Sequence, residues 1–500
     1  MRDKYYNYFL MLVLLLAVFL GLYRFYPYLY SDIPLGYDPG LYRAMFLDYI
    51  NTLPYIDFSS FSVRTRDAYP PFLGILGNTL YITGFDIDFL LTFGLAGFSI
   101  ITSIYIYLLL KKYGKIYAFH GMILYFLSII QYESFYMNYY KQILGVIFIL
   151  ASLYILEKKK YILSIPIIIS LFTIHRPSGL FFLIIVVLHY LLSFIIQIFS
   201  KNHTNKVSIK GKKANPQINI VFAKAKLYFK NTYKTIYTVL FAGIVSLLMY
   251  IPLFQELIWG LIKPLTTTIM VSGTSGTFFS LEDFLFFDFL AILLSIYGLY
   301  LKYRQKQFDY ITIGFLVGLI WTVFRLFFYN RFLIFFDIFI ILIAAYGLGH
   351  LYQYKKKTYL FIFILFFGLQ SYNYITYIRE YSESFISKTD LATIKQLDTL
   401  LPADSLLMTS DKHYGPWLFG YTHMSIISPG FTNYNIWDKS QWDRWWDNDG
   451  KTKCEMLKDY QKYNKPLYIR IGSKDDEDWT RGTCFEEVYK KDGVRVMRME

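Results

Sequence analysis

The sequence lacks the signatures of several common enzyme classes. It contains no P-loop, no Rossmann glycine pattern, no H-E-x-x-H motif and no cysteine and histidine spacing of the kind that binds zinc. These absences argue against a phosphate-binding loop, a dinucleotide-binding domain and a zinc hydrolase. Only two cysteines occur among the 500 residues, so at most one intramolecular disulfide can form.

Long apolar runs dominate the chain instead. Hydrophobic residues make up 55% of it and aromatic residues 21%, which is more than a soluble chain of this length usually carries. Runs such as "FLMLVLLLAVFLGLY" are apolar on all sides, which excludes the alternating strands of a membrane barrel. The first run, residues 8–30, has no small-residue cleavage site, so we expect it to be retained as a membrane span. The fold class is therefore an all-α polytopic membrane protein.

The basic residues of the loops predict how these helices are oriented. We expect eleven spans, at residues 8–30, 88–110, 116–132, 143–156, 161–174, 177–199, 234–254, 283–301, 310–328, 332–349 and 357–377. If the N-terminus is cytoplasmic, every inner loop is rich in Lys or Arg; these loops are 111–115, 157–160, 200–233, 302–306 and 354–357. That is the positive-inside pattern. The net charge of +14 thus reports orientation in the cell membrane, and we expect no nucleic-acid partner.

The chain is predicted to divide into two parts. Residues 1–378 form the membrane domain, with an outer loop at 31–87 and a cytoplasmic linker at 200–233. After it the composition shifts to polar stretches with turn signals and the alternating "PLYIRIGS", which indicates a small α/β domain at 379–500 on the outer, extracytoplasmic side. Both cysteines, Cys454 and Cys484, lie in this domain. Because outer compartments are oxidising, we expect a disulfide between them, with two free thiols as the alternative.

The stretch "GYDPGLYR", residues 36–43, holds an acid in a rigid turn. The glycines around Asp38 permit unusual backbone angles and the proline after it fixes the geometry, so its carboxylate is held near the membrane surface. The residues that follow predict a short helix with one apolar face, formed by Leu41, Ala44, Met45 and Tyr49. We expect this helix to lie flat at the membrane interface.

The acidic turn and the later "YPPFLGILGNTLYITGFDIDFLLTFGLAGFSIITSIYIYLLLKKYG" resemble the start of the GT-C superfamily of polytopic membrane glycosyltransferases, in the protein mannosyltransferase and aminoarabinose transferase branch. The resemblance covers about residues 8–200 and, more loosely, the chain up to 377. It implies a polyprenyl-phosphate sugar donor, transfer of a hexosyl or pentosyl group, and a lipid, glycan or protein acceptor at the outer face. It also implies that Asp38 is the catalytic base. Many relatives carry an adjacent acidic pair where this chain has Asp38 and Pro39, so participation of a second acid stays open.

Sugar transfer from a phosphate leaving group also needs positive groups that hold the departing phosphate. The outer ends of the spans supply candidates: Arg43, Lys141, His175, Arg176, Arg325 and Arg331. Arg325 lies inside an apolar run, so we expect it to face a polar cavity or a partner. A snorkelling arginine, or an ion pair with Glu133 or Asp337, is the alternative. For His175 a structural hydrogen-bonding role is the alternative.

Metal binding and two other functions remain as weaker interpretations. Asp86 and Asp88 in "FDIDF", together with Glu133, are weak candidates for a divalent metal, and the first two more simply start the next span as acidic helix N-terminal residues. A transporter or flippase would usually show internal repeats and broken helices, and no clear repeat is present. A non-catalytic glycan-binding membrane protein is the other rival. Loop 263–284 is expected to be mobile, either closing over substrate or serving as a plain connection.

The outer domain also carries polar and aromatic residues that lack a decided role. These are Asp411, His413, Trp417 and His423 in "DKHYGPWLFGYTHMSIISPG", followed by the tryptophans of "WDKSQWDRWW". Aromatic clusters of this kind stack on sugar rings in binding sites, and they equally form the core of small domains.

Overall fold

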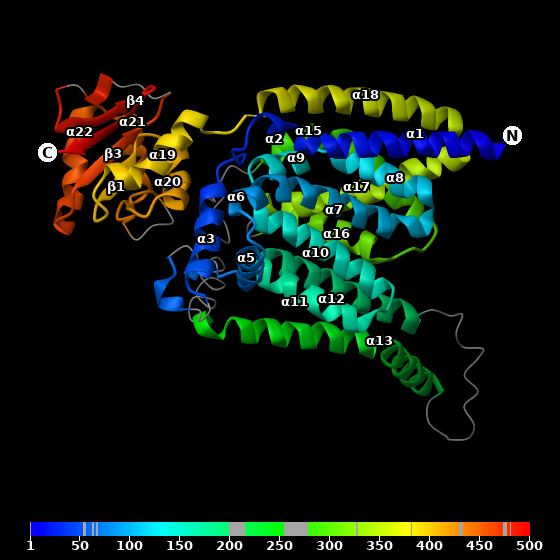
Figure 1. Cartoon of the computed structure of the whole chain (residues 1–500). Coiled ribbons are helices and arrows are strands. Elements are labelled where there is room, and N and C mark those ends of the chain that lie inside the picture. The colour runs from blue at the N-terminus through cyan, green and yellow to red at the C-terminus, as the bar shows by residue number, and fades with distance from the viewer. Residues whose placement is uncertain are drawn as a thin grey trace.

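The computed structural model describes residues 2–53, 57–62, 65–66, 69–199, 216–254, 279–326, 329–381, 383–429, 434–473, 478–480 and 482–500. It consists of a helical bundle and a small C-terminal domain that packs at one end of the bundle (Figure 1). Residues 263–278 of the expected mobile loop at 263–284 lie outside the described residues. The boundary expected at 378–379 falls in the last turn of the final bundle helix, α18 (Lys356–Glu380).

The bundle is built from apolar helices. Its other elements are α1 (Arg2–Leu22), η1 (Tyr23–Phe25), α2 (Tyr26–Tyr30), α3 (Pro39–Asn51), α5 (Pro71–Thr83), α6 (Ile87–Phe89), η3 (Leu90–Gly94), α7 (Leu95–Leu110), α8 (Lys115–Leu127), α9 (Ile129–Tyr136), α10 (Tyr140–Glu157), α11 (Tyr161–Ile174), α12 (Arg176–Phe199), α13 (Pro216–Met249), α15 (Leu281–Arg304), α16 (Tyr310–Val323) and α17 (Tyr329–Tyr354). Among the described residues, eight helical segments are long and apolar enough to cross a membrane. Three shorter apolar helices, α8, α11 and α16, lie within or overlap the three remaining expected spans. The protein is a multi-pass membrane protein, and the count of eleven spans stays a prediction.

Two expected spans end earlier in the structure than the apolar runs suggest. The run at 116–132 is divided because Ser128 starts a new helix, α9, where its hydroxyl accepts a hydrogen bond from the Gln131 amide at 3.1 Å. The run at 310–328 stops at Val323. There Arg325 adopts the left-handed conformation (φ +44°) and the Leu326 amide bonds back to the Trp321 carbonyl, which terminates the helix. The hydropathy of these two apolar runs does not reveal the helix start at Ser128 or the helix end before Arg325.

The second half of the cytoplasmic linker expected at 200–233 is helical. Helix α13 begins at Pro216 and continues without interruption to Met249, so residues 216–233 are helical. The lysines of this stretch suggested a loop, although proline at a first helical position and the apolar residues between the lysines suit an amphipathic helix. Tyr228 shows the packed side of that helix, because its side chain is buried and its hydroxyl donates to the Tyr190 carbonyl of α12.

Three of the basic loops meet at one end of the bundle. Lys112 Nζ, just after α7, lies 2.8 Å from Glu157 Oε1 at the end of α10 and 3.2 Å from Asp309 Oδ2 before α16. Asp309 Oδ2 also accepts from Lys302 Nζ of α15 at 3.0 Å. The sequence argument requires that these loops share a side, and they do. Figure 1 shows the N-terminus at the end of the bundle away from the C-terminal domain.

The short helix expected after Asp38 is α3, which runs across the ends of the bundle helices, between the bundle and the C-terminal domain (Figure 1). The four residues of its expected apolar face are all buried. They are covered largely by protein, because α3 packs against α5 on one side and against α20 (Gly415–Tyr421) of the C-terminal domain on the other. The helix is therefore enclosed at the joint between the two parts, and its position flat at the membrane interface stays a prediction.

The C-terminal domain is a five-stranded mixed sheet with helices. Its elements are α19 (Lys388–Leu400), β1 (Leu406–Thr409), α20, β2 (Ser425–Ile426), α21 (Lys439–Asp447), α22 (Gly450–Leu457), β3 (Leu467–Ile471), β4 (Phe485–Lys491) and β5 (Val494–Met499). The strand order is β2-β1-β3-β5-β4, with β1 parallel to β2 and β3, and β5 antiparallel to β3 and β4. Trp442 and Trp445 are buried in one of its cores, so these tryptophans build the domain. Cys454 and Cys484 form a disulfide.

Candidate functional site

Asp38 is the N-cap residue of α3, at the end of the bundle that faces the C-terminal domain. Gly36 has φ +83°, and its Cα lies so close to the backbone of Tyr136 and Met137 that a side chain there would overlap it. This contact ties the turn to the junction of α9 and α10. Asp38 itself is half-buried, and its carbonyl accepts from the Tyr42 amide at 3.1 Å in the first turn of α3.

Four of the six expected phosphate-binding residues come together near this turn. They are Lys141, His175, Arg176 and Arg331, and we refer to them as the cation cluster. Lys141 Nζ lies 5.9 Å from the centre of the Tyr42 ring, one helical turn from Asp38. His175 lies in the turn between α11 and α12, and the Gln142 amide group of α10 donates to the Arg331 carbonyl of α17 at 2.7 Å.

His175 is the centre of the cation cluster. Burial, together with the charges of the other three members, holds the pKa of His175 well below its ordinary value, so the imidazole is neutral at neutral pH. One ring nitrogen, Nδ1, is 2.7 Å from the Ser178 hydroxyl. Arg176 stacks on Tyr250 at 5.1 Å. The arrangement concentrates three positive charges around one neutral ring, which is the electrostatic setting that an anionic phosphate requires.

Arg43 and Arg325 stand apart from the cation cluster. Arg43 donates to the Gly420 carbonyl at 2.6 Å, lies 3.3 Å from Asp88 Oδ1, and stacks over Tyr421 at 4.4 Å. Its guanidinium therefore joins α3 to α20. Arg325 is exposed in the turn after α16 and lies 6.0 Å from the Tyr329 ring. Because α16 ends at Val323, Arg325 lies beyond the helix, and the expectation that it faces a polar cavity or a partner stays a prediction.

The three weak metal candidates have separate partners. Asp86 accepts from the Asp88 amide at 3.1 Å as the N-cap of α6, and Asp88 binds Arg43 and the Tyr421 hydroxyl. Glu133 is buried in α9 and accepts from the Tyr377 hydroxyl of α18. Within the described part of the chain, no group of three or more His, Cys, Asp or Glu side chains is arranged to hold a metal ion.

The C-terminal domain brings a histidine and an acid beside the Asp38 turn. His413 Nδ1 lies 2.7 Å from Asp411 Oδ1, and its ring stacks on Phe385 at 5.4 Å. The same ring meets the edge of Tyr37, the neighbour of Asp38, at 6.4 Å. Of the two interpretations left open for this stretch, a packing role applies to Trp417, which is fully buried. His413 and Asp411 are partly exposed and face the joint.

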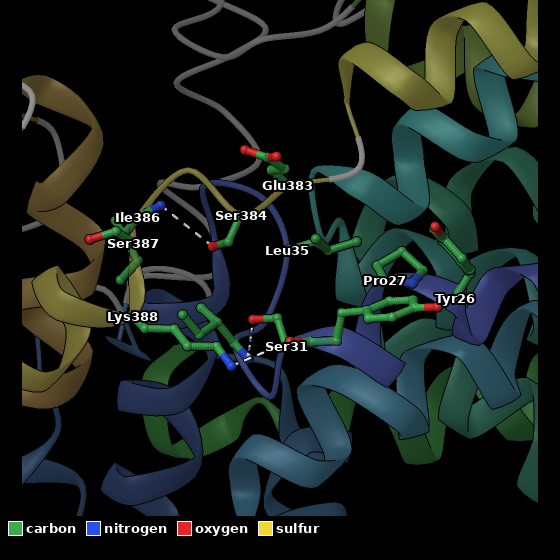
Figure 2. A pocket seen from close by; sticks show the side chains of 11 residues that line it. Tyr26, Pro27, Ser31, Leu35, Glu383, Ser384, Ile386, Ser387 and Lys388 are labelled. Atoms are coloured by element: carbon green, nitrogen blue, oxygen red, sulfur yellow. Dashed lines mark hydrogen bonds between the residues drawn. The ribbon is translucent and has the colours of Figure 1, made fainter.

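A cavity of about 290 Å³ lies on another part of the same joint. Figure 2 shows its lining, which comes from α2 and the residues just after it and from the linker that leads into α19. Lys388 Nζ donates to the Tyr30 carbonyl at 3.3 Å, and the Ser384 hydroxyl donates to the Pro34 carbonyl at 3.1 Å. None of the residues expected to act on a substrate lines this cavity.

Comparison with solved structures identifies the fold. The chain shares it with an archaeal oligosaccharyltransferase. The enzyme AglB of Archaeoglobus fulgidus, in complex with an inhibitory peptide and a dolichol-phosphate, superposes with a TM-score of 0.60 at 13% identity, over 94% of this chain and 70% of that one. The apo form of the Archaeoglobus fulgidus oligosaccharyltransferase gives 0.60 at 14% identity over 92% and 69%. Its form tethered to an acceptor peptide with an NVT sequon gives 0.55 at 14% identity over 93% and 69%. No protein-family model matches the sequence, and no match is found among curated proteins.

These likenesses support the GT-C fold that the sequence suggests, without favouring the mannosyltransferase and aminoarabinose transferase branch. The sequence argument missed the partners that the C-terminal domain supplies. Tyr421 and Gly420 are more than 300 residues away from Arg43 and Asp88 in the sequence, and no local sequence pattern predicts such contacts. The "DKH" triplet was visible, but only the fold shows that its histidine faces Tyr37.

Proposed function

We propose that this protein is a membrane glycosyltransferase that moves a sugar or glycan from a polyprenyl-phosphate-linked donor to an acceptor at the outer face of the membrane. The observation that carries the proposal is the placement of Asp38 one helical turn from Tyr42, whose ring faces Lys141 of the cation cluster. A carboxylate and a group of cations thus share one end of the bundle. The fold shared with AglB supports the same reaction class.

In the proposed reaction, Asp38 acts as the general base. Its carboxylate removes the proton of the acceptor's hydroxyl or amide as that group attacks the anomeric carbon of the donor sugar. The bond between that carbon and the phosphate oxygen breaks, and the phosphate departs with the electron pair. Lys141, Arg176 and Arg331 hold the negative charge that develops on the phosphate. Because His175 is neutral, it adds no charge to the cation cluster, and its Nδ1 lies 2.7 Å from the Ser178 hydroxyl.

The C-terminal domain is the proposed border of the acceptor site. His413 and Asp411 lie beside Tyr37, so an acceptor approaching Asp38 passes between the bundle and this domain. The solved relatives favour a peptide acceptor, because one of their forms is tethered to an acceptor peptide. Lipid and glycan acceptors follow from the wider family resemblance, and the choice among them belongs to experiment.

The test uses the purified protein in lipid nanodiscs. Radiolabelled polyprenyl-phosphate donors, carrying either one sugar or an oligosaccharide, are supplied with peptide acceptors or with membrane extract. We expect transfer by the wild type and a loss of about 10²- to 10⁴-fold in kcat for Asp38→Asn. Asp32→Asn is the matched control, since Asp32 is an exposed acid six residues earlier in the same outer segment, and it keeps full activity.

Two outcomes contradict the proposal at different points. Equal activity of wild type and Asp38→Asn removes Asp38 as the base. Absence of transfer with every donor, together with donor movement between the leaflets, favours the transporter interpretation instead. An impermeant thiol reagent applied to Asp38→Cys tests the orientation: we expect labelling from outside, and labelling only from inside contradicts the assigned side.

A further inference from the structure

A larger cavity lies at the end of the bundle opposite the Asp38 turn. Its volume is about 840 Å³, and its lining comes from α12, from the last turn of α15 and from the turn that leads into α16. The basic loops that Lys112 and Asp309 join lie at this same end of the bundle. The cavity is therefore separate from the proposed transferase site.

The cavity follows from the unequal extent of α12 and α16. The Tyr190 hydroxyl of α12 lies 3.1 Å from the hydroxyl of Tyr310, the first residue of α16, and the His189 ring packs on the Tyr310 ring at 4.2 Å. From this level α12 continues to Phe199, whereas the chain before Tyr310 turns back to the end of α15 at Arg304. The last turns of α12 thus extend beyond α16 and form one wall of the cavity.

The charged side chains in the lining are positive. Arg304 and Lys306 line the cavity, and no Asp or Glu does so within the described part of the chain. Arg304 Nη1 donates to the Tyr300 hydroxyl at 3.0 Å, which positions the guanidinium and leaves its other N–H groups for a ligand. Asp309, the next acid along the chain, is already paired with two lysines. A cavity with two cations and no acid is complementary to an anion.

The helix surfaces that lead to the cavity are apolar. Both α12 and α15 expose a stripe of large apolar or aromatic side chains at helical spacing. These stripes are Val187, Leu191 and Ile195 on α12, and Leu293, Ile296, Tyr300 and Tyr303 on α15. Tyr303 itself lines the cavity, and so does Ile196, the neighbour of Ile195. In a membrane protein such stripes contact lipid chains, so the ligand that suits this site carries both an anionic group and acyl chains.

We propose that this cavity binds the headgroup of an anionic phospholipid from the leaflet that faces the basic loops. The phosphate lies between Arg304 and Lys306, while the Ser193 hydroxyl and the Gln197 amide, one helical turn apart on α12, bind the other polar groups of the headgroup. The acyl chains follow the apolar stripes. The lipid thus links the end of α12 to the turn between α15 and α16. The site is independent of the proposed transferase reaction, because Asp38 lies at the other end of the bundle.

Two other occupants fit the cavity less well. Residues 200–215, which follow α12 in the sequence, contain five lysines and no acid, so like charge opposes the entry of this linker into a positive cavity. Free inorganic phosphate suits the two cations but makes no contact with the apolar stripes that end there. An anionic lipid suits both features.

The experiment measures lipid binding to the purified full-length protein in detergent by native mass spectrometry. The probes are phosphatidylglycerol and phosphatidylcholine with identical acyl chains, because they differ in the net charge of the headgroup. We expect phosphatidylglycerol to bind about 30-fold more tightly, since two basic residues at a membrane surface attract the anionic lipid. Inorganic phosphate, added at constant ionic strength, should leave this binding unchanged.

Two kinds of variant test the charge and the space separately. Arg304→Gln combined with Lys306→Gln should abolish the preference for phosphatidylglycerol. The matched control is Lys158→Gln combined with Lys159→Gln, which removes the same charge from exposed lysines at the same end of the bundle and should keep the preference. The match extends to the backbone, because Lys159 and Lys306 both have φ +56°. Ser193→Trp fills the cavity, keeps both cations and should also abolish the preference.

Three results overturn the proposal. Equal binding of the two lipids by the wild type means that the cavity selects no anionic headgroup, which is the result expected if the linker fills it. An equal loss of preference in both double variants means that surface charge in general attracts the lipid. Displacement of phosphatidylglycerol by inorganic phosphate means that the site takes the free anion, and an unchanged preference in Ser193→Trp means that the lipid binds elsewhere.

Discussion

Gly40 of α3 and Gly420 of α20 lie backbone against backbone. A Cβ atom at Gly420 would overlap the Gly40 backbone, and one at Gly40 would overlap the Pro416 carbonyl. The bundle and the C-terminal domain are therefore in direct main-chain contact, two residues from Asp38. Neither glycine has a positive φ, so both are required for space rather than for backbone conformation.

Gly420→Ala is expected to separate α20 from α3. The added methyl group meets main-chain atoms that cannot rotate away, and such overpacking costs about 1–3 kcal/mol. The change should lower the unfolding temperature and reduce transferase activity together. Gly97→Ala is the matched control, because a Cβ at that helical glycine meets open space and both properties should stay unchanged. Equal effects of the two variants contradict the close contact.

Arg43 and Tyr421 should show coupled stability effects. They share Asp88, which receives a hydrogen bond from the Tyr421 hydroxyl at 2.7 Å and lies 3.3 Å from Arg43 Nε. In a double-mutant cycle of Arg43→Met and Tyr421→Phe, we expect a coupling energy of about 0.5–3 kcal/mol in chemical unfolding. Lys395→Met serves as the comparison, since Lys395 is half-exposed and 3.6 Å from Asp88, and it should cost at most about 1 kcal/mol. Strict additivity means that the three side chains do not act as a unit.

The cation cluster should control use of the donor. Arg331→Gln and Lys141→Gln each remove a charge beside the proposed phosphate position. Hydrogen bonds to charged groups are worth about 1.5–3 kcal/mol, so kcat/KM for the donor should fall by about 10- to 100-fold. Arg325→Gln, an exposed arginine outside the cluster, should leave it unchanged. A fall for Arg325→Gln as large as that for Arg331→Gln means that the phosphate lies elsewhere.

Glu133 should make stability depend on pH near neutrality. Burial raises the pKa of Glu133 to about 7, although the Tyr377 hydroxyl opposes this shift. The native state keeps the Glu133 proton to a higher pH than the unfolded chain does. Glu133 therefore makes its full contribution to the free energy of unfolding below about pH 4, and this contribution is lost as the pH rises through about 7.

Glu133→Gln carries no charge at any pH. It should match the wild type near pH 4 and exceed its unfolding free energy by up to about 3 kcal/mol above about pH 8. Denaturant unfolding at several pH values measures the difference. Glu383→Gln, at an exposed glutamate, is the control and should follow the wild type. If the unfolding free energies of Glu133→Gln and the wild type change in parallel with pH, the raised pKa of Glu133 is contradicted.

The sequence predicted the membrane helices well, because insertion into a bilayer depends on hydrophobicity and loop charge, which are local properties of the sequence. The same patterns predicted that Lys112 and the basic residues near Lys302 share one end of the bundle. Helix ends depended on hydrogen bonds that composition does not encode. Ser128 divides one expected span, and the conformation of Arg325 ends another.

The candidate site was predicted less completely. The sequence singled out Asp38 and the four members of the cation cluster, and the fold brings these cations together. It could not separate Arg43 from them, because the partner that decides its position, Tyr421, belongs to a domain formed nearly 400 residues later. Long-range packing, which follows from the whole fold, was the missing information.

The main-chain contact of Gly40 with Gly420 limits how this protein can be taken apart. A chimera that exchanges the C-terminal domain with that of a relative must carry a matching α3, because the two helices fit only as a pair. Likewise, a shortened chain that ends after α18 loses α20, one of the two helices against which α3 packs. Exchanging α3 and α20 together is therefore the smallest exchange that keeps the turn of Asp38 in its native position.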